Sequence, residues 1–271
     1  GSVLASRRNS LMVRHIMANQ WVISGESMNK SQLQERASET VHNVVSSLAE
    51  YFYYYQHPDE GMKKIFLSNT AEETLLDINE RKVPTILLGP HLGNFDLFGM
   101  SLTWLGVHPF VLSHPNPNNA YKAQNRIREA VGMNIHPISF SSLREAKKVL
   151  KDGFCVVTGL DRPIPEGEEA KYRPRFFGRE AALPVFYVRL ALETGAAVRV
   201  ACGVRREDGN YFVDATDPIP MEKSDNLIEE NVLNAESVLR ATEDFIQGAQ
   251  SQWCMFHPVW PEVLPAVNTL T

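Results

Sequence analysis

Apolar residues recur at helical spacing in the N-terminal part of the chain. From residue 31 to about residue 56 the repeat predicts one long helix. Ser31 and Gln34 have the spacing of a capping box at its start. Its apolar positions are Val41, Val44, Val45, Leu48 and Phe52. The helix ends in an aromatic cluster, residues 51–55, whose composition favours core packing and would also suit a membrane interface.

Further along, short apolar runs alternate with amphipathic stretches. Strands are expected at 84–88, 109–112, 134–138 and 154–158, and helices at about 94–105, 118–131 and 141–150. Two late strands, 196–204 and 211–214, flank a polar turn, and a final helix covers about 226–250. This alternation predicts an α/β fold with a mixed, mainly parallel sheet and flanking helices.

Composition narrows the possibilities without selecting one function. Hydrophobic residues make up 44% of the 271 residues and charged residues 22%, as in an ordinary globular protein. The net charge of −5 gives no support for nucleic-acid binding by the whole chain. We expect one domain over residues 1–271, with a helical segment at about 1–80 and an α/β core at about 81–271.

Cysteine usage and hydropathy bear on compartment and anchoring. The three cysteines lie far apart without metal-ligand spacing, so we expect no metal, buried structural thiols at Cys155 and Cys202, and a reducing compartment. No apolar run reaches the roughly 18 residues that a membrane-spanning helix needs. The chain opens in basic sequence at Arg7-Arg8-Asn9, and we expect a segment to precede it in the natural protein.

A stretch rich in proline and arginine interrupts the alternating pattern. Residues 159–177 contain Pro163, Pro165, Gly167 and Pro174 as breakers. Positive charge gathers in and just after this stretch at Arg162, Lys171, Arg173, Arg175 and Arg179. In an acidic chain such a loop is a candidate binding element, and a solvated irregular loop is an equal alternative.

The candidate chemistry lies in residues 89–96, Gly-Pro-His-Leu-Gly-Asn-Phe-Asp, directly after the strand at 84–88. Ligand crevices of open α/β sheets lie at the carboxyl ends of strands. Within one helix His91 and Asp96 would be about 140° apart around the axis. If the helix instead begins near Gly93, Asp96 falls in its first turn and can reach back to the imidazole.

That geometry would make His91 a general base. We expect Asp96 to bind one nitrogen of the His91 ring and so to orient it. The other ring nitrogen would take a proton from an attacking hydroxyl. The backbone amides near Gly93 and Asn94 would stabilise the oxyanion of the intermediate. By spacing alone, a His–Asp pair with a purely structural role is the more common arrangement.

Several blocks in order resemble the bacterial lipid A biosynthesis (lauroyl/myristoyl) acyltransferase family, which includes phosphatidylinositol mannoside acyltransferases. The first is the His-x4-Asp block, which is similar to the family's His-x4-Asp/Glu motif in a Gly-Asn-aromatic context. The others are Arg7-Arg8-Asn9, Asn125-Arg126-Ile127-Arg128 with Gly132, Leu160-Asp161-Arg162, Arg175-Phe176-Phe177-Gly178, Leu183-Pro184 leading to residues 191–196, and Gln252-Trp253 with His257. Together, in this order, they are specific.

The resemblance implies a glycerolipid-acyltransferase-like fold and transfer of a fatty acyl group from acyl-CoA or acyl carrier protein to a hydroxyl of a membrane glycolipid. It implies no bound cofactor, and a place at the cytoplasmic face of the bacterial inner membrane, either peripheral or anchored by a preceding segment. Arg126, Arg128 and Arg162 are candidates for donor or acceptor phosphates, or for structural ion pairs. Asp161 could bind the acceptor, support the charge relay, or be a surface turn residue.

Two departures leave the substrate open. Pro163 stands where family members often have a second acidic residue, and Phe186 where a glycine is usual; with Arg189, Phe186 could reshape the acyl or acceptor pocket. Alternatives are a lysophospholipid or glycerol-phosphate acyltransferase, a thioester hydrolase, and a non-catalytic lipid-binding relative. His257 is expected to be structural.

Overall fold

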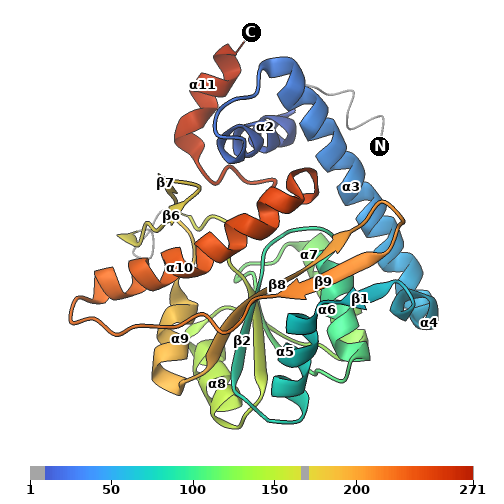
Figure 1. The fold of residues 1–271 in the computed structure, drawn as a ribbon, viewed down its shortest axis with the longest axis vertical. Helices are drawn as coiled ribbons and strands as arrows, with labels where there is room; N and C mark the ends of the chain where they lie inside the picture. The colour runs from blue at the N-terminus through green and yellow to red at the C-terminus, as the bar shows by residue number, and fades with distance from the viewer. Residues whose placement is uncertain (1–9, 166–170, 271) are drawn as a thin grey trace.

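The computed structural model of the protein describes residues 10–165 and 171–270. The basic block at residues 7–9 and Gly167 therefore lie outside the described residues. The chain folds around a seven-stranded sheet with the strand order β1-β9-β8-β2-β5-β3-β4 (Figure 1). The strands are β1 (Ile65–Leu67), β2 (Thr85–Gly89), β3 (Phe110–Ser113), β4 (Asn134–Pro137), β5 (Cys155–Gly159), β8 (Ala197–Arg205) and β9 (Tyr211–Ala215).

Five neighbouring strands, from β8 to β4, are parallel. Strand β9 pairs antiparallel with β8, and β1 pairs parallel with β9. The prediction of a mixed, mainly parallel sheet is confirmed, including the late strand pair. The edge strand β1 was not predicted, because three residues are too few for an alternation of apolar and polar positions to be detected.

Side chains of β2 alternate between the two faces of the sheet and so join two different hydrophobic clusters. Ile86 and Leu88 belong to the cluster that contains α8 (Phe140–Lys151), α9 (Phe186–Thr194) and α10 (Leu227–Gly248). Leu87 belongs to the cluster that contains α5 (Asn69–Asn79) and α6 (Phe95–Trp104). Figure 1 shows α8 and α9 on one side of the strands and α5 and α6 on the other. The result is a three-layer α/β arrangement.

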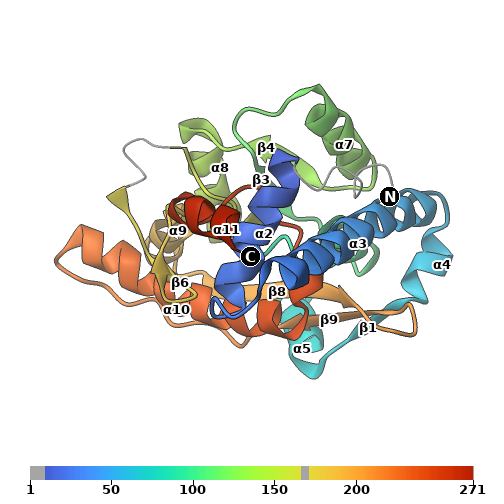
Figure 2. The ribbon, with the colours of Figure 1, turned by 90° about the horizontal axis from the view of Figure 1, so that it is seen from above.

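The remaining elements are α7 (Asn119–Ala130), α4 (Pro58–Met62), the short pair β6 (Arg175–Phe176) and β7 (Arg179–Glu180), and two 3₁₀ turns, η2 (Gln250–Gln252) and η3 (Pro261–Val263). Helices α2 (Leu11–Ile23), α3 (Lys30–Gln56) and α11 (Leu264–Thr269) gather above the sheet, with α2 between the other two (Figure 2). Within the described residues no helix is both long and apolar enough to span a membrane.

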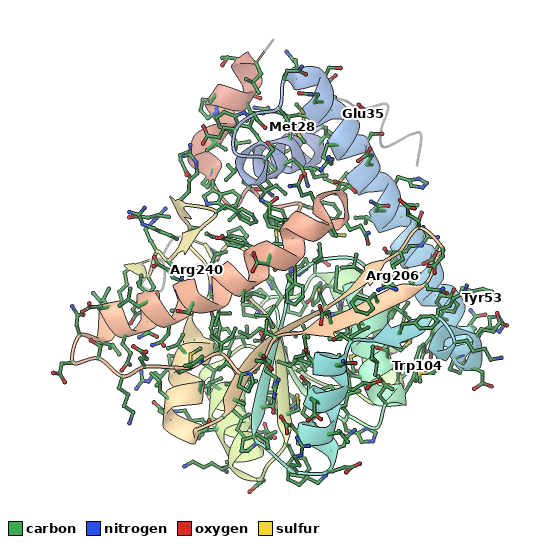
Figure 3. All side chains as sticks on the ribbon, in the orientation of Figure 1. Met28, Glu35, Tyr53, Trp104, Arg206 and Arg240 are labelled. Atoms are coloured by element: carbon green, nitrogen blue, oxygen red, sulfur yellow. The ribbon has the colours of Figure 1, made fainter. Side chains whose placement is uncertain are left out.

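The long N-terminal helix forms as predicted but differs in its start and its packing. Asn29 caps α3, and its side chain and that of Gln32 complete a capping box, so the predicted cap at Ser31 is wrong by two residues. Tyr51 and Tyr54 of the aromatic cluster are buried, whereas Phe52 is 43% exposed. Figure 3 shows Tyr53 near the end of this helix. The helix therefore packs with one face and leaves Val45, Leu48 and Phe52 exposed.

The three cysteines are buried and free, as expected for Cys155 and Cys202. A different buried contact constrains the loop between β2 and α6. Gly93 has φ +62°, and a Cβ built there would lie 2.0 Å from the carbonyl oxygen of Gly203 on β8. Because this atom is backbone, a side chain at residue 93 needs both a left-handed conformation and a displaced strand.

We therefore expect Gly93→Ala to lower the free energy of unfolding by well over about 1 kcal/mol, since strain and clash add. The matched control is Gly195→Ala, at the C-cap of α9, where φ is +71° and nothing lies within 4 Å of the added Cβ. Both variants carry the cost of the left-handed conformation, and only Gly93→Ala adds the clash with β8. Comparing the two by urea unfolding therefore isolates the cost of the clash. Equal losses would show that the contact between Gly93 and Gly203 does not matter.

Candidate active site

His91 lies in the loop that joins β2 to α6. Asn94 caps the helix by accepting a hydrogen bond from the Leu97 amide at 3.1 Å, so α6 begins at Phe95 and Asp96 falls in its first turn. His91 thus lies on the turn and Asp96 on the helix, which is the arrangement in which Asp96 was expected to reach the imidazole. The two side chains nevertheless have different partners.

The carboxylate that contacts His91 is that of Asp161. Its Oδ1 lies 2.7 Å from His91 Nδ1, and its Oδ2 accepts the backbone N–H of His91 at 2.8 Å and the indole N–H of Trp253 at 2.8 Å. Asp161 is completely buried, whereas the His91 side chain is 26% exposed. Of the three roles left open for Asp161, the geometry fits support of a charge relay.

Strand register explains why these residues meet. In the parallel pair β2–β5, Gly89 is opposite Gly159. His91 and Asp161 are each two residues beyond this pair, so both leave the carboxyl edge of the sheet side by side. A Cβ on Gly159 would lie 3.4 Å from His91 Cε1, so this glycine also leaves room for the imidazole.

The Asp161 carboxylate fixes the tautomer of His91. Burial by itself raises the pKa of Asp161, but the facing His91 and the hydrogen bonds from His91 and Trp253 outweigh burial and hold that pKa below its usual value. An ionised carboxylate only accepts hydrogen bonds, so Nδ1 of His91 must carry the proton. In the neutral ring Nε2 is then an acceptor, which is the state that a general base requires.

The prediction that Asp96 orients His91 is wrong. Asp96 Oδ1 accepts from Arg128 Nε at 2.9 Å and from Arg128 Nη2, and Asp96 Oδ2 accepts from Gln124. The guanidinium also donates to Asn125 at 2.9 Å. Asp96 therefore ties α6 to α7 through an ion pair whose side chains are 11% and 9% exposed. The spacing of His91 and Asp96 in the sequence could not show that Arg128 of α7 would bind Asp96. Nor could it show that β5 lies beside β2 and brings Asp161 to His91.

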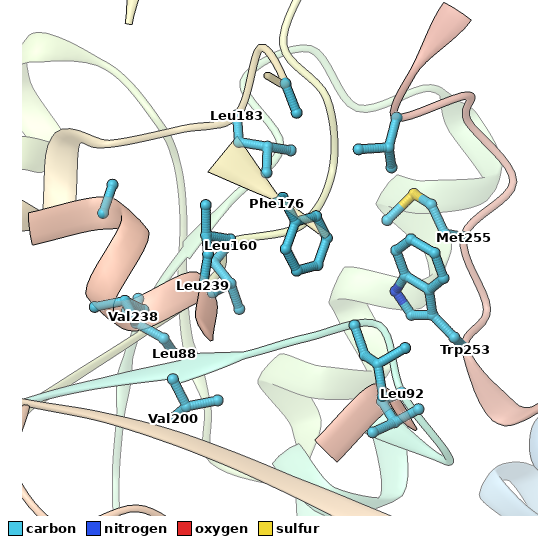
Figure 4. Close-up of a cluster of buried hydrophobic side chains, with 14 of the residues drawn as sticks. Leu88, Leu92, Leu160, Phe176, Leu183, Val200, Val238, Leu239, Trp253 and Met255 are labelled. Atoms are coloured by element: carbon cyan, nitrogen blue, oxygen red, sulfur yellow. The ribbon is translucent and has the colours of Figure 1, made fainter. Parts of the chain in front are cut away.

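The C-terminal segment closes the back of the site. Leu92 and Trp253 form an antiparallel bridge, and the Cys254 amide donates to the His91 carbonyl at 2.7 Å. Trp253 is 1% exposed and packs edge-on against Phe176, with ring centroids 6.1 Å apart. Figure 4 shows Trp253 and Leu92 at one side of the buried cluster that contains Phe176. The aromatic core thus positions the indole that holds Asp161.

The predicted oxyanion donors are already occupied. The Gly93 amide donates to the Gln252 carbonyl at 2.9 Å, and the Asn94 amide to the Gly203 carbonyl at 3.3 Å. The Asn94 side-chain amide donates to the Ser47 carbonyl and the Tyr211 hydroxyl. The prediction for Gly93 and Asn94 is therefore wrong, because pairing with β8 and the C-terminal segment uses both backbone amides.

Two cavities meet at His91. The first runs between α6 and strands β3 and β5, with an empty volume of about 730 Å³, and Phe98, Leu102, Val111 and Met133 give it apolar walls. The second, of about 870 Å³, lies between α3 and α7. Its lining is also largely apolar, but Gln124, Arg162 and His257 add polar and charged side chains to it, and we call it the polar cavity. His91, Phe95, Asp96, Tyr121 and Arg128 line both cavities. Of these residues, sequence reasoning missed Tyr121 and Gln124, which carry no motif, and it gave His257 only a structural role.

The three candidate phosphate-binding arginines have separate locations. Arg162 lines the polar cavity and makes no ion pair with any described residue. Arg128 is engaged by Asp96, and Arg126 is exposed on α7. Phe186 and Arg189 line another cavity, between α8 and α9, so they do not shape either cavity at His91.

Of the positive charges in and just after residues 159–177, Arg162 lines the polar cavity, whereas Arg173, Arg175 and Arg179 line neither cavity at His91. Arg173 and Arg179 pair with Glu180 and Glu26, and the Arg175 amide donates to Glu236. Among the described residues, no group of three or more histidine, cysteine or acidic side chains could hold a metal ion.

Comparison with known proteins places these features in a family. The family model described as "Bacterial lipid A biosynthesis acyltransferase" matches residues 16–262. The chain is also similar to phosphatidylinositol mannoside acyltransferase of Mycobacterium tuberculosis, with 32% identity over 124 residues. That match covers 42% of this chain and 36% of the relative, so the chain matches about a third of the relative's length.

The lowered pKa of Asp161 predicts a pH-dependent stability. Its stabilising contribution is present above the unfolded pKa of 3.8 and is lost as pH falls through the lower folded pKa. We expect urea unfolding to show wild type more stable than Asp161→Asn at about pH 7, with the difference shrinking below about pH 4. The control is Asp225→Asn, at an exposed position. A difference that grew as the pH fell would contradict the assigned ionisation.

Proposed function

The chain belongs to the bacterial lipid A biosynthesis acyltransferase family, and on that basis we propose that it transfers a fatty acyl group from an acyl thioester to a hydroxyl of a membrane glycolipid. Acyl-CoA or acyl carrier protein would be the donor, and a lipid A precursor-like or glycosylated phospholipid the acceptor. One observation carries the proposal: the Asp161-oriented His91 stands where a cavity with apolar walls meets a second cavity that also carries Arg162 and His257.

The chemistry follows from the free ring nitrogen. His91 Nε2 takes the proton from the acceptor hydroxyl while the hydroxyl oxygen attacks the thioester carbonyl carbon. Asp161 stabilises the imidazolium that forms. When the tetrahedral intermediate collapses, the carbon–sulfur bond breaks, and His91 returns the proton to the leaving thiolate. The products are the ester and the free thiol, and neither a metal nor an acyl-enzyme is needed.

The two cavities suit the two parts of this reaction. The apolar cavity between α6 and the sheet is suited to an acyl chain, because burying methylenes there removes them from water. Gly99 faces this cavity, and Met133 Cε lies 3.1 Å from the position its Cβ would take. The polar cavity carries Arg162, whose guanidinium suits a phosphate of the donor or acceptor.

The exposed side of α3 supports a location at a membrane. Val44, Ser47 and Leu48 line the polar cavity, and Leu48 continues outward into the exposed residues Val45 and Phe52. Apolar side chains beside the mouth of a cavity would let a lipid acceptor enter from a bilayer surface. We place the protein at the cytoplasmic face of the bacterial inner membrane, where acyl thioesters are available.

The test follows free thiol release from acyl-CoA and from acyl carrier protein, with and without lipid acceptors. We expect release that depends on a glycolipid acceptor and falls by about 10²- to 10⁴-fold in His91→Ala, because a positioned general base contributes about that factor to the rate. The matched control is His136→Ala, which changes a histidine on the edge strand β4 outside both cavities.

Other outcomes identify the alternatives. Acceptor-independent release would indicate a thioester hydrolase, in which His91 activates water. Release only with lysophospholipid or glycerol phosphate would assign the acceptor to that class. Absence of release with both donors would contradict the proposal and favour a lipid-binding role.

A further inference from the structure

A side chain at the carboxyl edge of β3 has unused hydrogen-bonding capacity inside the apolar cavity. Ser113 is 6% exposed, and its Oγ is buried without a hydrogen-bond partner among the described residues. The same residue lines the cavity that contains His91. Most buried hydroxyls have a partner, so an orphan one in a catalytic cavity requires an explanation.

Strand register places this hydroxyl beside His91. Leu112 of β3 is opposite Thr158 of β5, the last pair of that ladder, and Ser113 and Gly159 are the residues that follow it. Gly159 is in turn opposite Gly89 of β2. Paired residues of parallel strands point to the same face of the sheet. Since a Cβ on Gly159 would point at the His91 ring, Ser113 lies on that face of the sheet, on a strand whose backbone is about 4.8 Å from that of β5.

Gly89, Gly159 and Ser113 thus form a row along the carboxyl edge of the sheet, and all three line the apolar cavity. The two glycines leave open space next to the imidazole, and Ser113 is the residue of this row that carries a polar side chain. Thr158, which lines the same cavity, has its hydroxyl engaged by the Leu112 carbonyl at 3.1 Å. The Gly93 and Asn94 amides are also engaged, so a developing oxyanion needs a donor other than these two amides.

We propose that Ser113 is that donor: its hydroxyl hydrogen-bonds the carbonyl oxygen of the acyl thioester and the oxyanion formed from it. This inference rests on the proposed acyl transfer. The hydroxyl keeps its proton throughout, donating more strongly as negative charge gathers on the oxygen and relaxing when the carbon–sulfur bond breaks. No covalent bond to Ser113 forms.

The test is Ser113→Ala, compared with wild type in acyl-CoA turnover and in urea unfolding. We expect kcat to fall by about 10²-fold with KM nearly unchanged, because the bond strengthens in the transition state. Stability should be unchanged or higher, because the substitution removes a buried hydroxyl that has no partner in the free protein. Ser113→Cys replaces the hydroxyl with a weaker donor of similar shape, so its kcat should lie between those of wild type and Ser113→Ala.

The matched control is Ser101→Ala, a buried serine of α6 that lines neither cavity at His91. It removes a hydroxyl that donates to the Phe98 carbonyl at 2.7 Å, so it should lower stability while leaving kcat within about threefold of wild type, since its bond is structural. Ser113→Ala with wild-type kcat would overturn the inference and leave the proposed function standing. An acyl group on Ser113, seen by mass spectrometry of wild type during turnover, would overturn it by making the residue a nucleophile. Wild type without thiol release from any acyl donor would overturn both.

Discussion

A buried carboxylate with three donors holds the site together. Removing an ionised carboxylate from water is costly unless its lone pairs are satisfied. Asp161, completely buried, meets that condition only where the loop after β2, the loop after β5 and the C-terminal segment converge. Breaking such a buried arrangement costs about 3–5 kcal/mol. The same contacts that stabilise the fold therefore also fix the ring of His91.

Small residues at the sheet edge provide the space that this arrangement leaves open for a substrate. Gly89 and Gly159 stand opposite each other on β2 and β5, and Gly93 touches the backbone of β8. Asp96 has a different role, because together with Arg128 it joins α6 to α7, two helices that contribute walls to both cavities. The two carboxylates thus act separately: Asp161 orients the base, and Asp96 holds the cavity walls.

Much of this architecture could be predicted from local patterns. The alternation of apolar runs and amphipathic stretches predicts most strands within one or two residues, and His91 at the carboxyl end of a strand marks the site. The partner of His91 could not be predicted this way, because Asp161 lies 70 residues away and meets it only through the order of strands. The occupied amides of Gly93 and Asn94 depend on equally distant segments. Periodicity likewise predicts α3 but not which of its faces packs.

Asp161, rather than Asp96, accepts the hydrogen bond from His91 Nδ1–H. NMR of the ring nitrogens and of the Nδ1 proton in wild type, Asp161→Asn and Asp96→Asn tests this assignment. We predict one Nδ1–H tautomer with a downfield, slowly exchanging proton in wild type. That signal persists in Asp96→Asn and is lost, or replaced by mixed tautomers, in Asp161→Asn. A signal lost in Asp96→Asn and unchanged in Asp161→Asn would contradict the claim.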